Sequence, residues 1–370
     1  MIILLLLFYI FIVVLCIQLF FYVYVFSHVK QKKETLTASQ TFPVSVVVCA
    51  KNEAENLEIF LPYLLNQEYP NFELVLINDG STDSTLRVME RFKDQHPNIK
   101  IVNVKSIETF WGNKKYALTL GIKAATHNHL LFTDADCKPV SNQWISEMSK
   151  GFSSQHKIVL GYGAYAKVKN SFLNKLIRYE TLMTAVQYFS FSRLGQSYMG
   201  VGRNLAYTKE LFFEARGFMD HMHIKSGDDD LFVNQIASAS NTAICISKES
   251  FTESIPKKTY SDWITQKRRH ISTAKNYKTK HKTMLSAFYV SQFLFLVLGI
   301  ALLITLFRWE IIVGLIVLRY IALYITVSLA AKKLEEKDLI PFFPFLEIFL
   351  IVAQLSIFIK NLISKPNHWK

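Results

Sequence analysis

The chain has 370 residues, of which 51% are apolar, and it carries a formal net charge of +13. This length gives room for one sizeable soluble domain and an additional part, and the apolar content indicates that the additional part lies in a membrane. The four cysteines, at positions 16, 49, 137 and 245, have no metal-binding or redox spacing. We interpret them as reduced bystanders, although Cys137 follows an acidic pair directly.

The first predicted element is a transmembrane helix within residues 1–27. Its apolar run extends from residue 2 to residue 26 with Gln18 as an interruption, and this is long enough to cross a hydrocarbon core of about 30 Å. A cleavable signal peptide is the competing interpretation. The run has no Lys or Arg before it, is too long, and is followed by no small-residue cleavage site, so the membrane anchor is favoured.

Strands and helices then alternate. Apolar runs predict strands, and helical patterns lie between them; the strands are at residues 44–49, 72–77, 101–104 and 130–133, and the helices at 57–64, 84–92 and 114–125. Polar loops after each strand are typical of a mostly parallel, doubly wound α/β sheet. Because ligands of such sheets bind beyond the carboxyl ends of the strands, the acidic loops are expected to share one edge.

The fourth predicted strand ends in Asp134 and Asp136. Carboxylates at positions i and i+2, where a buried strand meets solvent, suit a hard divalent cation held against a diphosphate, since Mg²⁺ and Mn²⁺ prefer carboxylate, phosphate and water ligands. Taken alone, the pair also fits a solvated turn at a strand end. Its interpretation as a metal site therefore depends on the other motifs of the chain.

The later part of the chain contains more apolar segments. Residues 172–191 fit either an amphipathic helix at the membrane surface or a helix of the core, and the pattern does not separate the two. Residues 285–307 and 311–331 predict a hairpin of spanning helices. Residues 339–363 are interrupted by two prolines and a glutamate, so this segment is expected either to span or to lie partly in the interface.

Basic residues orient the protein in the membrane. Three lysines lie within residues 30–33, and nine Lys or Arg against one Asp occupy residues 257–282. Such residues stay on the cytoplasmic side, so residues 28–284 are predicted to form a cytoplasmic domain and residues 285–370 the C-terminal membrane helices of a multi-pass protein of the cell (inner) membrane. Attraction to membrane lipids and to an anionic substrate explains the positive charge without nucleic acid.

Seven segments occur in order: VSVVVCAKNEAENL, LVLINDGSTDST, GNKKYALTLGI, LLFTDADC, GRNLAY, SGDDDLF and QKRRH. Together they closely resemble the inverting, membrane-anchored glycosyltransferases of family 2, relatives of the hyaluronan, cellulose and poly-N-acetylglucosamine synthases, over roughly residues 42–275. The resemblance implies a GT-A fold, a mostly parallel α/β sheet with helices on both faces, beside transmembrane helices. It also implies a UDP-sugar donor and Mg²⁺ or Mn²⁺ as the cofactor.

The resemblance carries donor-side roles onto matching positions. It implies that Asp79 accepts a hydrogen bond from the uracil ring, while Asp83 caps a helix. It also implies that Asp136 binds the metal and that Asp134 orients the ribose or sugar or joins the metal ligands. The residues implied to bind the nucleotide-sugar are Ala50, Glu53, Asp79, Lys114, Asp134, Gln266 and Arg269.

The segment SGDDDLF resembles the motif that supplies the general base, which places that role on Asp228. Like-charge neighbours are expected to raise its pKa toward the working range. Gly227 stands where many members have a glutamate, and Asp229 and Asp230 are alternatively helix caps. The acceptor-side residues implied by the resemblance are Arg203, Asn204, Asp229 and His270.

The QKRRH segment departs from the family pattern Q-x-x-R-W at its last residue. His270 replaces a tryptophan that provides an acceptor-stacking surface in polymerising members, which argues for transfer of a single sugar to a lipid-linked or glycan acceptor with a β product. A processive polysaccharide synthase and a catalytically inactive membrane scaffold are the alternatives. The sequence does not encode which sugar is transferred, the linkage or the oligomeric state.

Overall fold

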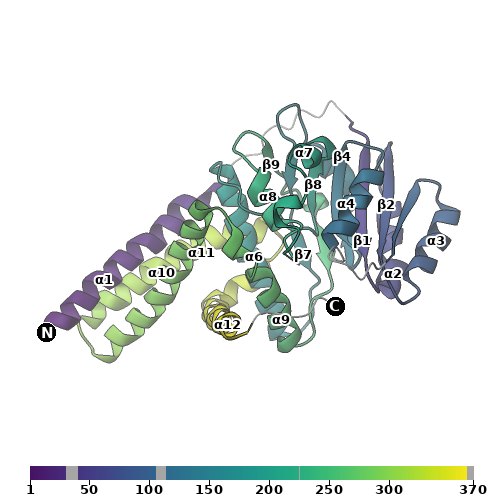
Figure 1. The fold of residues 1–370 in the computed structure, drawn as a ribbon. Coiled ribbons are helices and arrows are strands. Elements are labelled where there is room, and N and C mark those ends of the chain that lie inside the picture. Colours follow the sequence, from purple (N-terminus) through teal and green to yellow (C-terminus); the bar gives the residue numbers. More distant parts are fainter. Residues whose placement is uncertain (31–40, 106–113, 225, 365–370) are drawn as a thin grey trace.

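A computed structural model describes residues 1–30, 41–105, 114–224 and 226–364 of the protein. An α/β domain lies at one end, and a slanted bundle of helices extends from it (Figure 1). Among the described residues, four segments are helical, long enough and apolar enough to cross a membrane: Ile2–Val29, Thr279–Ile304, Trp309–Lys333 and Lys337–Ile363.

The main sheet has seven strands among the described residues, in the order β3-β2-β1-β4-β8-β6-β9. They are β1 (Val44–Ala50), β2 (Phe72–Asp79), β3 (Ile99–Val104), β4 (His129–Asp134), β6 (Ile158–Leu160), β8 (Leu205–Thr208) and β9 (Thr242–Ile244). Strand β1 pairs in parallel with both β2 and β4, whereas β8 runs antiparallel to β4 and β6. The predicted mostly parallel α/β sheet is confirmed.

Helices cover both faces of this sheet, because side chains along a strand alternate in direction. Val46 and Val48 of β1 belong to a core with residues of α2, α3 and α5, while Val47 packs in the core that includes α4 and α8. The helices are α2 (Ala54–Leu65), α3 (Thr85–Gln95), α4 (Lys114–Ala124), α5 (Trp144–Ser149), α7 (Lys209–Glu214) and α8 (Asp230–Ile236).

A second, smaller sheet lies next to the acidic pair. It has the order β5-β10-β7, with β5 (Cys137–Pro139), β10 (Thr252–Ser254) and β7 (Gly163–Tyr165). Strand β5 begins directly after Asp136, so the turn between β4 and β5 is held by a sheet on each side.

Helix α6 (Phe172–Arg193) is a helix of the core. Most of its residues are buried, and it packs on η2 (Phe26–Lys30), α11 and α12. Of the two interpretations of residues 172–191, burial inside the protein is therefore the one found, because α6 lies between the sheet and the apolar helices.

The bundle in Figure 1 consists of α1 (Ile2–Leu19), α10 (Thr279–Ile304) and α11 (Trp309–Lys333). Helix α1 continues as a π-helical segment, η1 (Phe20–Val25), before it reaches η2. Phe11 stacks on Phe295 at the contact between α1 and α10. Helix α10 begins before its apolar residues do, because its first turns, which carry Lys280 and Lys282, extend beyond the apolar stretch.

A buried polar cluster joins these helices to α12 (Phe343–Ile363). Arg319 of α11 donates two hydrogen bonds of 2.7 Å to the carboxylate of Glu347 on α12. The same carboxylate accepts from Gln292 of α10 at 2.8 Å and from Tyr22 of η1 at 3.2 Å. Because an unpaired charge is costly away from water, these contacts hold the start of α12 against the bundle.

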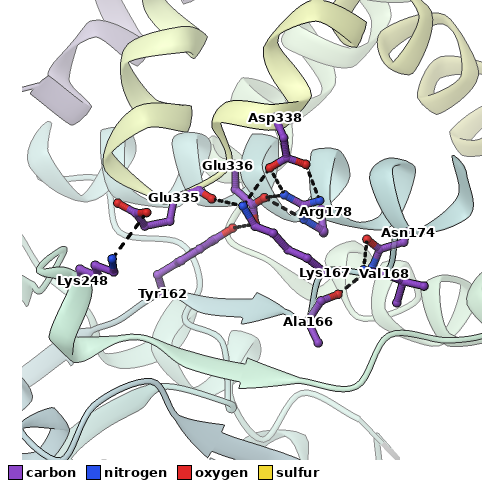
Figure 2. Close-up of polar contacts among 10 residues, drawn as sticks. All are labelled: Tyr162, Ala166, Lys167, Val168, Asn174, Arg178, Lys248, Glu335, Glu336 and Asp338. Atoms are coloured by element: carbon purple, nitrogen blue, oxygen red, sulfur yellow. Dashed lines mark hydrogen bonds and ion pairs between the residues drawn. The ribbon is translucent and has the colours of Figure 1, made fainter. Parts of the chain in front are cut away.

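A second polar junction connects the α/β domain to the segment between α11 and α12 (Figure 2). Arg178 of α6 pairs with Glu336 and Asp338, and the Tyr162 hydroxyl also donates to Glu336 at 3.3 Å. Lys167 donates to Asp338 at 2.8 Å. Arg178 and Glu336 are both buried, so this network fixes where the chain turns after α11.

Candidate active site

The acidic pair lies where β4 ends, beside the end of β1. Asp134 pairs in register with Cys49, the residue before Ala50. Oxygens of Asp134 and Asp136 and the sulfur of Cys137 lie within 4.8 Å of one another. Burial and the charge of Asp134 raise the pKa of Asp136, so a cation bound to both carboxylates would offset their repulsion.

The donor set of this cluster fits a hard divalent ion through its carboxylates. Cys137 is fully buried, and its sulfur lies 2.8 Å from the Ser254 hydroxyl. Burial raises the pKa of the Cys137 thiol well above its usual range. Since Mg²⁺ and Mn²⁺ prefer oxygen ligands to sulfur, Asp134 and Asp136 would hold the ion and Cys137 would remain outside its ligand set.

Lys114 connects the acidic pair to the SGDDD segment. Its ammonium lies 2.9 Å from Asp134 Oδ1 and 3.1 Å from Asp228 Oδ2. The three residues come from the start of α4, the end of β4 and the loop before α8. Burial opposes the charge of Lys114, but Asp134 and Asp228 outweigh it and raise the lysine pKa well above its usual range.

The expected rise in the pKa of Asp228 is not found. Burial favours the protonated carboxyl, but the ion pair with Lys114 is stronger and lowers the pKa of Asp228. The rise falls on Asp229 instead, where burial and the charges of Asp228 and Asp230 raise the pKa to about 7. The prediction considered the like-charge neighbours and missed the lysine, which lies far away in the sequence.

The consecutive aspartates have different partners. Asp229 is the N-cap of α8: it accepts from the backbone N–H of Asp230 and of Gly202, both at 2.7 Å. Asp230 is buried and accepts from the hydroxyls of Thr273 and of Tyr277, the latter at 2.6 Å. Asp229 and Asp230 therefore fix the loop, and Asp228 faces Lys114.

Gly227 precedes Asp228 in a backbone conformation that requires glycine. Its φ is +94°, and a Cβ at this position would lie 2.5 Å from Leu231 Cδ1. Side chains rarely adopt this conformation. A glutamate, which the resemblance implies at this position in many members, would have no room in this loop as it stands.

The predicted nucleotide end lies at the carboxyl ends of β1 and β2. Asp79 is the last residue of β2. Burial raises the pKa of Asp79, although the charges of Lys51 and Lys114 oppose this rise. Asp83 accepts from the backbone N–H of Thr85 at 2.9 Å and of Ala54 at 3.3 Å. Asp83 thus joins the starts of α2 and α3, which is the structural role expected for it.

Glu53 faces the acidic pair from the loop after β1. Burial raises its pKa, and so do the charges of Asp136 and Asp134. Its backbone N–H donates to the Thr85 hydroxyl at 2.9 Å, and its carboxylate accepts from Asn56. Ala50, the last residue of β1, is buried, and its contact with a nucleotide stays a prediction.

The QKRRH segment lies on α9 (Tyr260–Ile271). The charges of Lys114 and Arg203 act on the His270 imidazole, so the end of α9 faces the same site. Gln266 Oε1 is buried and has no hydrogen-bond partner within the described ranges. Lys267 pairs with Glu180 of α6, which connects α9 to the core helix.

Two predicted acceptor-side residues are held by the protein itself. Arg203 donates to the carbonyls of Ala164 and Gly163 at 2.7 Å, and its guanidinium lies 4.1 Å from the Tyr165 ring centre. Asn204 is fully buried and bonds to Trp144, Tyr162 and Ser250. These contacts indicate a structural role for Asn204, whereas the charge of Arg203 still reaches Asp136.

Sequence reasoning missed two lysines. Lys115, beside Lys114, is buried and donates to the carbonyls of His221 and Ile224 at 2.8 and 3.0 Å. It therefore fixes the segment before SGDDD. Lys257 is exposed, and its charge acts on Asp136 and Glu53. In the sequence, only its place in the basic stretch before QKRRH indicated a role near the acidic pair.

Comparison with known proteins adds a family match. Residues 45–214 match the family model described as Glycosyl transferase family 2. The matched range includes the acidic pair and ends before Asp228. The α9 segment also lies beyond it.

Curated relatives are similar over parts of the chain. Poly-beta-1,6-N-acetyl-D-glucosamine synthase of Staphylococcus epidermidis is 34% identical over 93 residues, which cover 25% of this chain and 21% of that protein. Glycosyltransferase AglE of Haloferax volcanii is 32% identical over 110 residues, covering 29% and 34%. The chain thus aligns with about a fifth to a third of the length of these relatives.

Among solved structures, the fold resembles that of a mannosyltransferase from Pyrobaculum calidifontis, solved in complex with GDP-Man and Mn²⁺. The TM-score is 0.62 at 18% identity, over 95% of this chain and 96% of that one. The similarity extends over the helices as well as the α/β domain and shows a shared GT-A fold.

Proposed function

We propose that the chain, whose residues 45–214 match the model of glycosyl transferase family 2, is a glycosyltransferase that transfers a sugar from a UDP-sugar to a hydroxyl of a lipid-linked or glycan acceptor, with inversion. The observation that carries this proposal is the convergence of Asp134, Lys114 and Asp228 from three elements on one point. A metal-binding carboxylate, a phosphate-binding cation and a base are the three groups that such a transfer requires.

The leaving end of the donor would lie at the acidic pair. Asp136 and Asp134 would hold Mg²⁺ or Mn²⁺, and the ion, when bound, offsets the charge that develops on the departing nucleoside diphosphate. Glu53 lies in the loop after β1, and Asp79 ends β2, the next strand of the sheet. This order supports a nucleotide extended along the sheet edge, with its base near Asp79.

Lys114 has a second partner once a donor is bound. In the free protein its ammonium is shared between Asp134 and Asp228. A diphosphate carries more negative charge than either carboxylate and competes for this cation. Movement of Lys114 toward the phosphates would release Asp228 when the donor is in place.

Asp228 would then act as the general base. It takes the proton of the acceptor hydroxyl, whose oxygen attacks the anomeric carbon as the bond to the diphosphate breaks on the opposite side. The electron pair of that bond leaves with the nucleoside diphosphate, which needs no proton. An α-linked donor therefore gives a β-glycoside.

Helix α9 would close the site from the membrane side. Arg269 suits a bidentate contact with the diphosphate, and the unpartnered Oε1 of Gln266 is an acceptor for a ligand hydroxyl or amide. His270 offers a smaller surface than tryptophan, which supports a single transfer. The apolar helices support a membrane-associated enzyme, with the α/β domain on the cytoplasmic side as the charge pattern predicts.

The experiment is a donor screen with the full-length protein in lipid nanodiscs. UDP-glucose, UDP-galactose, their N-acetyl forms and GDP-mannose are each supplied with Mn²⁺ or Mg²⁺, and release of nucleoside diphosphate is measured with a lipid extract as acceptor. We expect release with a UDP-sugar, its loss on chelation with EDTA, and label in the lipid fraction. Absence of turnover with every donor would contradict the proposal, and a ladder of long products would favour a processive synthase.

A further inference from the structure

Helix α12 departs from the direction of the bundle. It lies crosswise to α1, α10 and α11, near α6 and α9 (Figure 1), and its main packing partners are α6, α9 and η6 (Lys337–Phe342). By length and composition it would be able to cross a membrane. Its position against the α/β domain differs from that of a helix that crosses the membrane beside the bundle.

The two faces of α12 differ in what they contact. One face is buried and includes Leu346, Glu347, Leu350 and Ile357. The opposite face is exposed and almost wholly apolar, at the three- and four-residue spacing of a helical stripe. Its residues are Phe345, Ile348, Phe349, Val352, Leu355, Phe358, Ile359, Leu362 and Ile363.

Polar contacts fix the start of α12 in this direction. The network in Figure 2 holds Glu336 and Asp338, just before the helix, on Arg178 of the α/β domain. Within the first turns, Arg319 of the bundle holds Glu347. The chain is therefore bound on both sides where it turns from α11 into α12.

The far end of α12 is bound to α9 through Arg268. The guanidinium donates to Asn361 Oδ1 at 2.9 Å and to the carbonyl of Ser364 at 2.6 Å. It also donates to the carbonyl of Lys360 at 3.2 Å. A cation at the last carbonyls of a helix is favourable, and Arg268 lies between Gln266 and Arg269 in the sequence.

We propose that α12 lies in the membrane interface on the side of the α/β domain, with its apolar face in the lipid, and that Arg268 is a positioning residue through which α12 holds α9. The occupant of the exposed face is lipid, because α1, α10 and α11, the apolar helices to which Glu347 joins α12, also expose large apolar side chains. Lys360 lies in the last turn of α12, and Lys365 and Lys370 follow it in the sequence without an acidic residue, which favours the same side as the other basic segments.

The consequence for catalysis rests on the proposed function. Helix α9 carries Gln266 and Arg269, which are assigned to the donor diphosphate. Loosening of α9 should therefore weaken donor binding more than it slows the bond-breaking step. The location of α12 is independent of any activity.

Labelling with a membrane-impermeant maleimide in oriented vesicles tests the location. Ser364→Cys, at the end of α12, should label only from the side that labels Ser154→Cys in the α/β domain. Thr305→Cys, between α10 and α11, should label from the opposite side, and the unaltered protein is the blank for native thiols. Labelling of Ser364→Cys together with Thr305→Cys would show that α12 spans and would overturn the proposal.

A fluorophore on Val352→Cys tests the occupant of the exposed face. Brominated lipids should quench it, while the same fluorophore on Ser154→Cys should be unaffected. Protection of position 352 in a bilayer, as a second copy of the chain on this face would produce, contradicts lipid as the occupant.

Arg268→Ala tests the positioning role. Amide hydrogen exchange should become faster in α9 and stay unchanged in α2 and α3. Asn361→Ala should speed exchange in α9 less when Arg268→Ala is already present than it does alone. With an active donor, KM for the donor should rise about tenfold with a smaller change in kcat. Arg91→Ala, which breaks an exposed ion pair with Glu58, is the control.

Unchanged exchange in α9, or equal effects of Arg268→Ala and Arg91→Ala, would overturn the positioning role. If the unaltered protein turned over no donor, the proposed function would fail. The labelling, quenching and exchange results would still decide the place of α12 and its hold on α9.

Discussion

At the scale of single residues, Lys114 determines the charge state of the site before a donor binds. It lowers the pKa of Asp228, so its removal should move the acidic limb of the kcat/KM profile to higher pH, because Asp228 must be ionised to act as a base. Lys114→Ala should also lower kcat/KM by at least about tenfold, because the proposed contact with the donor phosphates is lost. Lys123→Ala, an exposed lysine on the same helix, should change neither quantity.

His221 gives a prediction about stability. Burial and the charge of Lys115 lower its pKa to about 4, below the unfolded value of about 6.5. The folded protein thus favours the neutral ring, so this contribution is present above pH 6.5 and is lost as the pH falls from 6.5 to 4. Over that pH range, the free energy of unfolding of His221→Phe should fall by roughly 1–3 kcal/mol less than that of the unaltered protein. Thermal unfolding at each pH measures this, and parallel curves for the two proteins would contradict it.

At the scale of elements, the SGDDD loop is held by the segment that leads into α10. Tyr277 donates to the buried Asp230 at 2.6 Å. Tyr277→Phe should cost about 1–3 kcal/mol of stability, because a hydrogen bond to a buried charge is lost, and should reduce turnover a few-fold as the loop loosens. Tyr63→Phe, on an exposed turn of α2, is the control for thermal unfolding; equal melting temperatures of the two variants would refute the coupling.

The elements themselves were predictable where the pattern is local. Strands β1, β2 and β4 follow from apolar runs that end in polar loops, and the shared sheet edge follows from their parallel order. The partner of Asp228 was not predictable, because the contact with Lys114 joins two loops over a long sequence separation. The surroundings of Asn204 were equally hidden from the sequence: its motif resembles an acceptor-side loop, but its side chain is buried in the core.

At the scale of the whole molecule, the site lies between a sheet edge and the apolar helices. Hydropathy locates four apolar segments but contains nothing about their direction, so the crosswise course of α12 depends on tertiary ion pairs such as those of Arg178 and Arg319. These pairs connect the α/β domain to the membrane part. A soluble fragment that lacks α12 should therefore lose the contacts that hold α9.

The most direct test of the account is the turnover of Asp228→Asn in nanodiscs, with the best donor of the screen and saturating Mn²⁺. We predict a fall in kcat of at least about a hundredfold, as expected for loss of a general base, with nucleotide binding retained by calorimetry. Asp220→Asn, an exposed aspartate paired with Arg216, should keep full activity. Full turnover by Asp228→Asn would contradict the assignment of the base and, with it, the proposed mechanism.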